Sequence, residues 1–166
     1  MTAHTDIAPR LRMRAQANPQ RFQTAVFGTL YAEPSRNGIY KTSSYHGRGT
    51  RIVNMGEMFG FEFISNQEMN RVALTSRELS ISGLADGDLL FGRRSVVPSG
   101  AGKCALVDCP TEPLTFESSI IRVRLNKAVA DPRYYYYFFS SPAGRSCFPA
   151  KPRCPNVRLC PTCPPG

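Results

Sequence analysis

The chain has 166 residues, of which 42% are hydrophobic and 20% are charged. This length favours one domain, and the apolar content excludes a chain that is disordered by composition. No run of about 18 apolar residues occurs, which excludes a transmembrane helix, and the N-terminus lacks the apolar segment of a secretory signal. The net charge of +9 favours a polyanionic partner, most often nucleic acid. We therefore expect a basic, cytoplasmic protein.

The two ends of the chain differ in composition from its centre. Residues 1–20 contain three arginines and few apolar side chains, which predicts a flexible basic arm. The arm is either a DNA-contacting tail or, more simply, a solvated leader. Residues 147–166 hold six of the 14 prolines and four of the six cysteines. Proline at this density interrupts helices and sheets, so we expect a disordered Pro/Cys-rich tail and a domain over residues 21–146.

The first half of that domain is predicted to contain two strands and a short helix. Residues 51–55 form a short strand-like run, and residues 59–64 alternate apolar and polar side chains. Thr75 and Glu78 have the spacing of a capping box. A helix is therefore expected to run from there toward Leu84.

The second half is predicted to contain further short strands. Residues 85–88 indicate a turn that leads into a strand at residues 89–91, and residues 104–107 indicate another strand. Residues 119–125 alternate between apolar side chains and arginines. Arg122 and Arg124 would then lie on an exposed cationic face of a half-buried strand.

A helix is expected to follow Asp131, with Asp131 as its N-cap and Pro132 at its first position. Tyr134, Tyr137 and Phe138 fall on one face of this helix. Many short strands with few helices favour an α+β fold.

Two patterns in the sequence resemble catalytic motifs but are incomplete. Residues 99–103 resemble a phosphate-binding loop, yet Val97 and Cys104 replace its required glycine and hydroxyl residue. Residues 131–134 resemble the Asp-Pro-Pro-Tyr motif of adenine methyltransferases, but Arg133 interrupts it. Neither histidine lies in a recognised pattern with a nucleophile. We therefore predict no catalytic residues and no cofactor.

The cysteines of the tail raise the alternative of a small zinc-binding protein. Cys160 and Cys163 form a CxxC pair, and Cys147 and Cys154 complete a set of four thiols. Their irregular spacing matches no familiar zinc module, and a chain without an export signal is expected to keep its thiols reduced. Our prediction is therefore that no metal is bound.

The middle of the chain, over residues 37–145, contains five segments that follow one another in a characteristic order. They are residues 37–59 (through the runs 37–41, 47–49 and 51–59), residues 87–95 (similar to Gly-Asp-Ile-Leu-Phe-x-Arg), residues 102–107 (Gly-Lys-x-Ala-x-Val), residues 116–124 (Ser-Ser-Ile-Ile-Arg-x-Arg) and the helix of residues 132–141. Each segment is weak alone, whereas five in the right order are specific. Together they resemble the target-recognition domain of type I restriction-modification DNA specificity subunits.

The resemblance implies a single α+β domain of short, mostly antiparallel strands with a few helices. It implies a non-catalytic protein that binds double-stranded DNA at one half of a bipartite site. It also implies two partners, a methyltransferase subunit and an endonuclease/translocase subunit. After Arg145 the sequence departs from the family, so we expect a truncated or frameshifted gene. The alternative in the enzyme class is a fragment of a fused restriction-methylation enzyme.

DNA recognition needs cations for phosphates and a few donors directed at base edges. Lysines and arginines in or beside the glycine-rich turns are therefore the expected DNA-binding residues, and arginine can bind guanine through two hydrogen bonds. They are Lys41, Arg48, Arg51, Arg93, Arg94 and Lys103. The alternative for each is a solvated surface charge.

Overall fold

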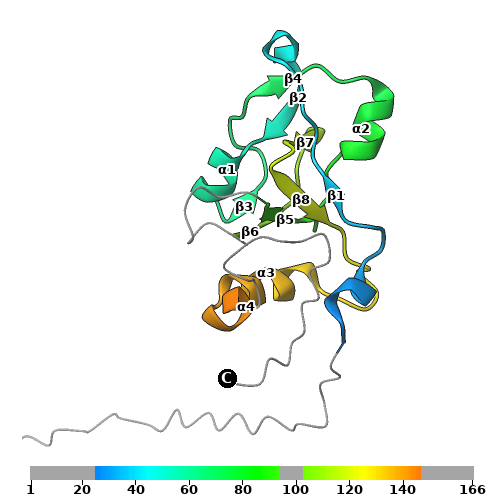
Figure 1. Cartoon of the computed structure of the whole chain (residues 1–166), viewed down its shortest axis with the longest axis vertical. Coiled ribbons are helices and arrows are strands. Elements are labelled where there is room, and N and C mark those ends of the chain that lie inside the picture. Colours follow the sequence, from blue (N-terminus) through cyan, green and yellow to red (C-terminus); the bar gives the residue numbers. More distant parts are fainter. Residues whose placement is uncertain (1–24, 94–102, 147–166) are drawn as a thin grey trace, which may run out of the picture.

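A computed structural model describes residues 25–93 and 103–146 (Figure 1). The predicted arm, the predicted tail with its four cysteines, and Arg94 lie outside the described residues. The described helices and strands form two sheets and four α-helices. No helix within these residues is long and apolar enough to cross a membrane.

The larger sheet has five strands in the order β1-β8-β5-β6-β3 and lies in the middle of the molecule (Figure 1). Its strands are β1 (Arg36–Asn37), β3 (Phe63–Ile64), β5 (Leu89–Gly92), β6 (Cys104–Val107) and β8 (Ile120–Val123). The smaller sheet has the order β4-β2-β7 and reaches the upper end of Figure 1. Its strands are β2 (His46–Val53), β4 (Arg71–Val72) and β7 (Leu114–Phe116). Within the described residues four of the six strand pairings are antiparallel.

The four helices lie around the two sheets. They are α1 (Met55–Gly60), α2 (Ser76–Ser82), α3 (Pro132–Ser140) and α4 (Pro142–Ser146). Helices α3 and α4 lie at the lower end of Figure 1, and α2 lies beside the smaller sheet. Short strands in two sheets with few helices confirm the predicted α+β class.

The core consists of two layers, one on each face of the five-stranded sheet. Alternate residues of β5 enter different layers, because successive strand side chains point to opposite faces: Leu89 and Phe91 pack with α3, and Leu90 packs toward the smaller sheet. Phe139 of α3 belongs to the first layer, and Phe116 of β7 belongs to the second. Both faces of the central strands are therefore covered, which explains why β5 and β6 are apolar throughout.

The predicted turns and caps around α2 and α3 are confirmed. The Thr75 side chain accepts a hydrogen bond from the amide of Glu78 at the start of α2, which begins one residue later. Asp131 caps α3 by accepting from the amide of Arg133, with Pro132 at the first position. Each of these caps joins residues that are two or three positions apart, so its formation does not depend on tertiary packing.

The predicted strand at residues 59–64 is largely wrong. Phe59 belongs to α1, and only residues 63–64 are in a strand. The amide of Asn54 donates to the Glu57 carboxylate at 2.8 Å, and this contact begins a helix directly after β2. The preceding predicted strand accordingly ends at Val53, although it begins earlier, at His46.

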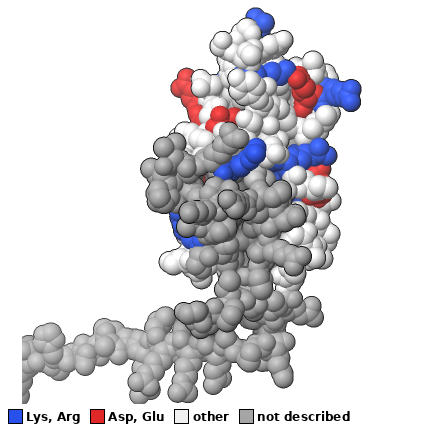
Figure 2. Space-filling view, in the orientation of Figure 1, with Lys and Arg blue, Asp and Glu red and all other residues white. Residues whose placement is uncertain are grey.

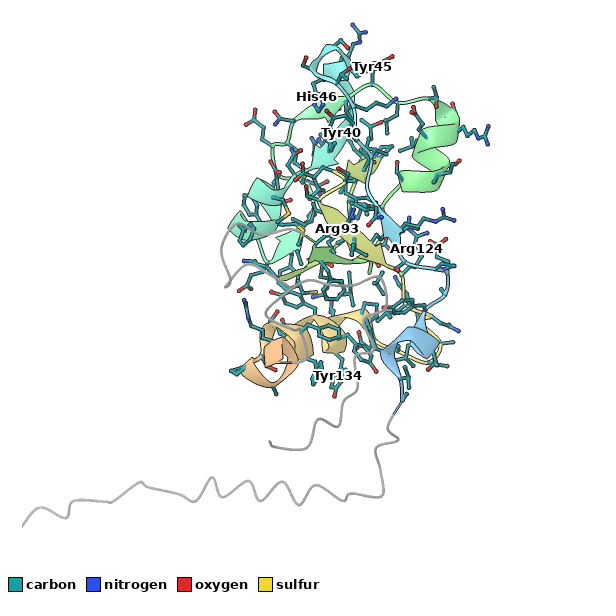
Figure 3. All side chains as sticks on the ribbon, in the orientation of Figure 1. Tyr40, Tyr45, His46, Arg93, Arg124 and Tyr134 are labelled. Atoms are coloured by element: carbon teal, nitrogen blue, oxygen red, sulfur yellow. The ribbon has the colours of Figure 1, made fainter. Side chains whose placement is uncertain are left out.

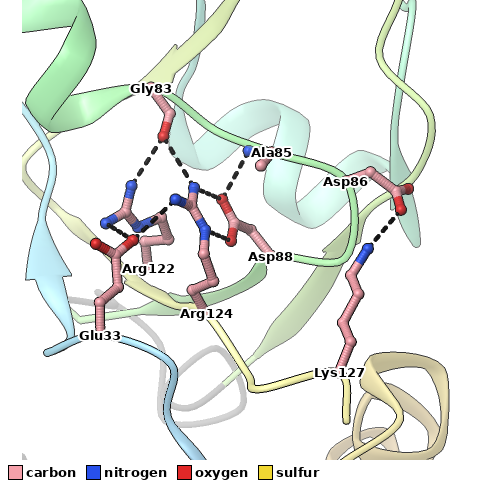
Figure 4. A network of polar contacts seen from close by, with 8 residues as sticks. All are labelled: Glu33, Gly83, Ala85, Asp86, Asp88, Arg122, Arg124 and Lys127. Atoms are coloured by element: carbon pink, nitrogen blue, oxygen red, sulfur yellow. Dashed lines mark hydrogen bonds and ion pairs between the residues drawn. The ribbon is translucent and has the colours of Figure 1, made fainter.

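The predicted exposed cationic face of β8 is wrong for Arg122, and Arg124 is only partly exposed. Arg122 is 2% exposed, and its guanidinium donates to Glu33 and to the carbonyl oxygen of Gly83 (Figure 4). Arg124 binds the buried carboxylate of Asp88 at 2.7 Å. Arg122 is covered because segments from elsewhere in the chain, at Gly83 and Glu33, lie against it, whereas the Arg124 side chain remains 32% exposed.

The face that Tyr134, Tyr137 and Phe138 share on α3 lies mainly away from the core. Tyr134 and Tyr137 are about 60% exposed, whereas Tyr136 and Phe139 are buried. Helical spacing defines which residues lie together, but the direction from which the sheet approaches decides which face is buried.

Candidate nucleic-acid interface

A glycine bulge projects one arginine from the upper end of the smaller sheet. His46 and Thr50 of β2 both pair opposite Val72 of β4, so the residues between them are extra in the ladder. Gly47 and Gly49 have φ angles of +90° and +91°, a conformation that glycine adopts at little steric cost. Arg48 lies between them and is exposed. We call residues 47–49 the glycine bulge.

Substitution of Gly49 by alanine tests how strongly the bulge is built into the sheet. An added Cβ would lie 2.6 Å from the carbonyl oxygen of Val72, in addition to the strained φ angle. We expect a loss of about 1–3 kcal/mol in the free energy of unfolding, measured by urea denaturation. Gly47→Ala is the matched control, because its φ angle is equally positive but its Cβ would meet nothing within 4 Å. Equal losses in the two variants would show that close packing against β4 is unimportant.

Exposed aromatic side chains accompany the bulge. Tyr40 is 81% exposed, Tyr45 is 46% exposed, and His46 is exposed beside them (Figure 3). We call residues 40–46 the aromatic loop. Sequence reasoning missed it, although its tyrosines and histidine lie among basic residues and glycines, a combination typical of nucleic-acid contacts.

Two of the predicted DNA-binding residues are engaged in ion pairs. Lys41 binds the carboxylate of Glu78 in α2, and its side chain is only 17% exposed. Arg51 binds Glu112 at 3.2 Å, and the same carboxylate binds Arg71 at 3.0 Å. Sequence reasoning assigned no role to Arg71, which lies opposite Arg51 in the β2–β4 ladder.

The remaining predicted residues differ in their surroundings. Arg93 follows β5 and is exposed near the centre of the view in Figure 3. Lys103 donates to the carbonyl oxygen of Phe59 at 3.1 Å and lies 5.7 Å from the centre of its ring. Within residues 25–93 and 103–146, the side chains of Arg48 and Arg93 form neither a hydrogen bond nor an ion pair. No described side chain or carbonyl group therefore competes with a ligand for these two guanidinium groups.

The charges of this face are mixed rather than uniformly basic. Figure 2 shows lysines and arginines over its upper and middle parts, with acidic side chains among them. A shallow hollow of about 340 Å³ beside the bulge has both Arg48 and Arg71 in its wall, together with Glu112. The two arginines outnumber this one carboxylate, so the hollow is weakly cationic.

A cluster of possible metal ligands lies elsewhere, between β6 and α3. Single ligand atoms of Asp86, Asp108 and Cys109 all lie within 4.8 Å of one another. Lys127 binds Asp86 at 2.8 Å, and Arg133 binds Asp108 at 2.6 Å. The charges of Asp86 and Asp108 raise the pKa of the Cys109 thiol, which disfavours the thiolate that metals bind. Both carboxylates of this cluster are thus already paired with cations of the protein, Lys127 and Arg133.

No family model matches the chain. It is 30% identical over 126 residues to the Type I restriction enzyme EcoKI specificity subunit of Escherichia coli (strain K12). That match covers 75% of this chain and 26% of the relative, so the chain spans about a quarter of the length of the curated relative.

A solved structure from a type I system has a similar fold. A chain from a study of the complex assembly and conformational transition of the type I R-M system matches with a TM-score of 0.52 and 13% identity. The match covers 76% of this chain and 30% of that chain. This chain is therefore similar in sequence to a type I restriction enzyme specificity subunit, and it shares its fold with a chain of a type I R-M system.

Proposed function

We propose that this domain binds double-stranded DNA in a sequence-specific manner, as the recognition part of a type I specificity subunit in the cytoplasm. The observation that carries the proposal is the glycine bulge. It holds Arg48 at the end of a sheet, unpaired within the described residues and next to the exposed rings of the aromatic loop. The homology to a type I specificity subunit supports the same assignment.

Arg48 and Arg93, which have no partner within the described residues, differ in how they are presented. Arg48 is exposed in the glycine bulge, where the pairing of β2 with β4 ends, and its guanidinium can bind the O6 and N7 atoms of guanine in the major groove. Arg93 lies on the broader middle of the same face, which favours a contact to phosphate. Tyr40 and His46 add ring faces and hydrogen-bonding groups at the projecting end.

We propose no catalytic step for this chain. In this reading, its two partners are the methyltransferase subunit and the endonuclease/translocase subunit of a type I system, which carry out the reactions. The domain's own contribution is the free energy of binding to one half of a bipartite site. This assignment rests on homology to about a quarter of a specificity subunit.

Salt titrations of DNA binding test the proposal. We expect the logarithm of the affinity to fall linearly with the logarithm of salt concentration, with a slope of about −0.9 per phosphate contact. Arg93→Ala is expected to weaken binding to all duplexes alike and to reduce the steepness of this slope by about 0.9. Arg48→Ala is expected to cost roughly 1–3 kcal/mol on a duplex selected from a random pool and little on a scrambled duplex.

Arg133→Ala is the matched control for lost charge. Arg133 is exposed and paired with Asp108 at the start of α3, at the other end of the molecule from the bulge. Charges farther away than about 10 Å are largely screened at 0.1 M salt, so this variant should retain wild-type affinity and slope. If the wild-type protein shows no salt-dependent binding, or if Arg133→Ala weakens binding as much as the other two variants, the proposed interface is wrong.

A further inference from the structure

Lys41 connects the aromatic loop to α2 through several contacts. Its ammonium group pairs with the Glu78 carboxylate and lies 4.7 Å from the centre of the Tyr45 ring. Its carbonyl oxygen is 3.3 Å from the Nε2 atom of His46. Lys41 thereby contacts two of the exposed rings of the loop while its own side chain is largely covered.

The partner of Lys41 is held rigidly by its helix. The Glu78 carboxylate accepts hydrogen bonds from the Thr75 amide at 2.9 Å and from the Thr75 hydroxyl at 3.0 Å, as part of the capping box of α2. The hydrogen bond from Lys41, together with those from Thr75, lowers the pKa of Glu78 from 4.5 to about 2. Glu78 is therefore ionised throughout the pH range in which DNA binding is measured.

A backbone contact joins the same two segments. The amide of Ala73, just before α2, donates to the carbonyl oxygen of Tyr45 at 2.8 Å. The aromatic loop is therefore connected to the α2 segment at Tyr45 by the main chain and at Lys41 by a charge pair. His46 is also held by its pairing with Val72 in the β2–β4 ladder. Within the described residues, the Lys41–Glu78 pair is the side-chain hydrogen bond between the loop and α2, so its removal leaves these two segments joined by the main chain alone.

We propose that Lys41 is a positioning residue that orients the aromatic loop for DNA through Glu78, and that its ammonium group does not contact phosphate. To reach a phosphate, the ammonium would have to leave both Glu78 and the Tyr45 ring, whereas Arg48 is exposed and has no ion pair to lose within the described residues. This inference rests on the proposed DNA-binding function.

Two substitutions distinguish positioning from direct contact. Lys41→Met removes the charge but keeps an unbranched side chain, and Glu78→Gln removes the opposite charge but retains an acceptor for the capping box. We expect each variant to bind the selected duplex about fivefold more weakly, with the wild-type salt slope. The double variant should lose no more than either single variant, and Lys41→Arg should retain binding.

Glu78→Gln gives the sharpest contrast. If Lys41 contacts phosphate, removal of a negative charge near DNA should tighten binding, and Lys41→Met should reduce the steepness of the salt slope by about 0.9. If the wild-type protein binds DNA and either result is obtained, the positioning role of Lys41 is wrong but the proposed DNA-binding function stands. Absence of salt-dependent binding by the wild-type protein overturns the proposed function instead. The midpoints of urea denaturation of all variants show whether weaker DNA binding comes from a misoriented aromatic loop or from a destabilised fold.

Discussion

Replacement of Asp88 by alanine is expected to lower the free energy of unfolding by about 3 kcal/mol. The Asp88 side chain is completely buried, and its carboxylate accepts two hydrogen bonds from Arg124 at 2.7 Å each (Figure 4). It also accepts from the amide of Ala85 at 2.7 Å. The substitution removes the acceptor of the Ala85 amide and of two Arg124 nitrogens, although Arg124 keeps its ion pair with Glu33 at 2.9 Å. Loss of one partner of a buried, hydrogen-bonded ion pair is costly. Urea denaturation measures the loss.

Asp86 provides the matched control for Asp88, because it lies two residues earlier in the same turn. Its side chain and that of its partner Lys127 are both more than half exposed. An exposed pair of this kind contributes between zero and about 1 kcal/mol, so Asp86→Ala should be mild. If the two variants are equally unstable, the network of Figure 4 has no special stabilising role.

Replacement of Phe139 by alanine is expected to cost about 3–5 kcal/mol, since the substitution leaves a cavity in the layer beneath α3. Phe139 is 1% exposed, and its ring centre lies 4.8 Å from that of Phe27 and 5.3 Å from that of Phe91. These contacts join α3 to the N-terminal part of the domain and to the central strand β5. Thermal and urea denaturation should both report the loss.

Tyr137→Ala is the control for the helix itself. Tyr137 lies on the same helix, two residues earlier, and is 60% exposed. Its replacement should change stability by no more than about 0.5 kcal/mol, as for other surface positions. If Tyr137→Ala is the more destabilising of the two, α3 packs through the opposite face in solution.

The signals that sequence analysis interpreted correctly are short in range. The capping box of Thr75 and Glu78 and the Asp131 cap with Pro132 each depend on neighbours within three positions. The apolar runs at residues 89–91 and 104–107 are strands for a similar reason, since their turns and side chains favour extended backbone. The five ordered segments of residues 37–145 identified the relationship to specificity subunits, which the comparisons confirm.

The candidate site was predicted only in part, because ion pairing depends on distant residues. The partner of Lys41 is 37 positions away, and the partner of Arg51 is 61 positions away. A sequence pattern shows that these side chains are cationic and lie near glycines, but it carries no information about which carboxylates approach them. The assignment of all six basic residues to DNA stays a prediction, and the structure separates the engaged cations from Arg48 and Arg93.

The amino-acid sequence by itself determined the α+β class, the caps and turns, the basic character and the family relationship of this protein. Only the tertiary structure decided which faces are buried. Arg122 alternates with apolar residues as an exposed strand residue does, yet it is buried, with its guanidinium hydrogen-bonded to the Gly83 carbonyl oxygen and paired with Glu33. Periodicity groups side chains on a common face, whereas burial of that face depends on a second element that packs against it from elsewhere in the chain.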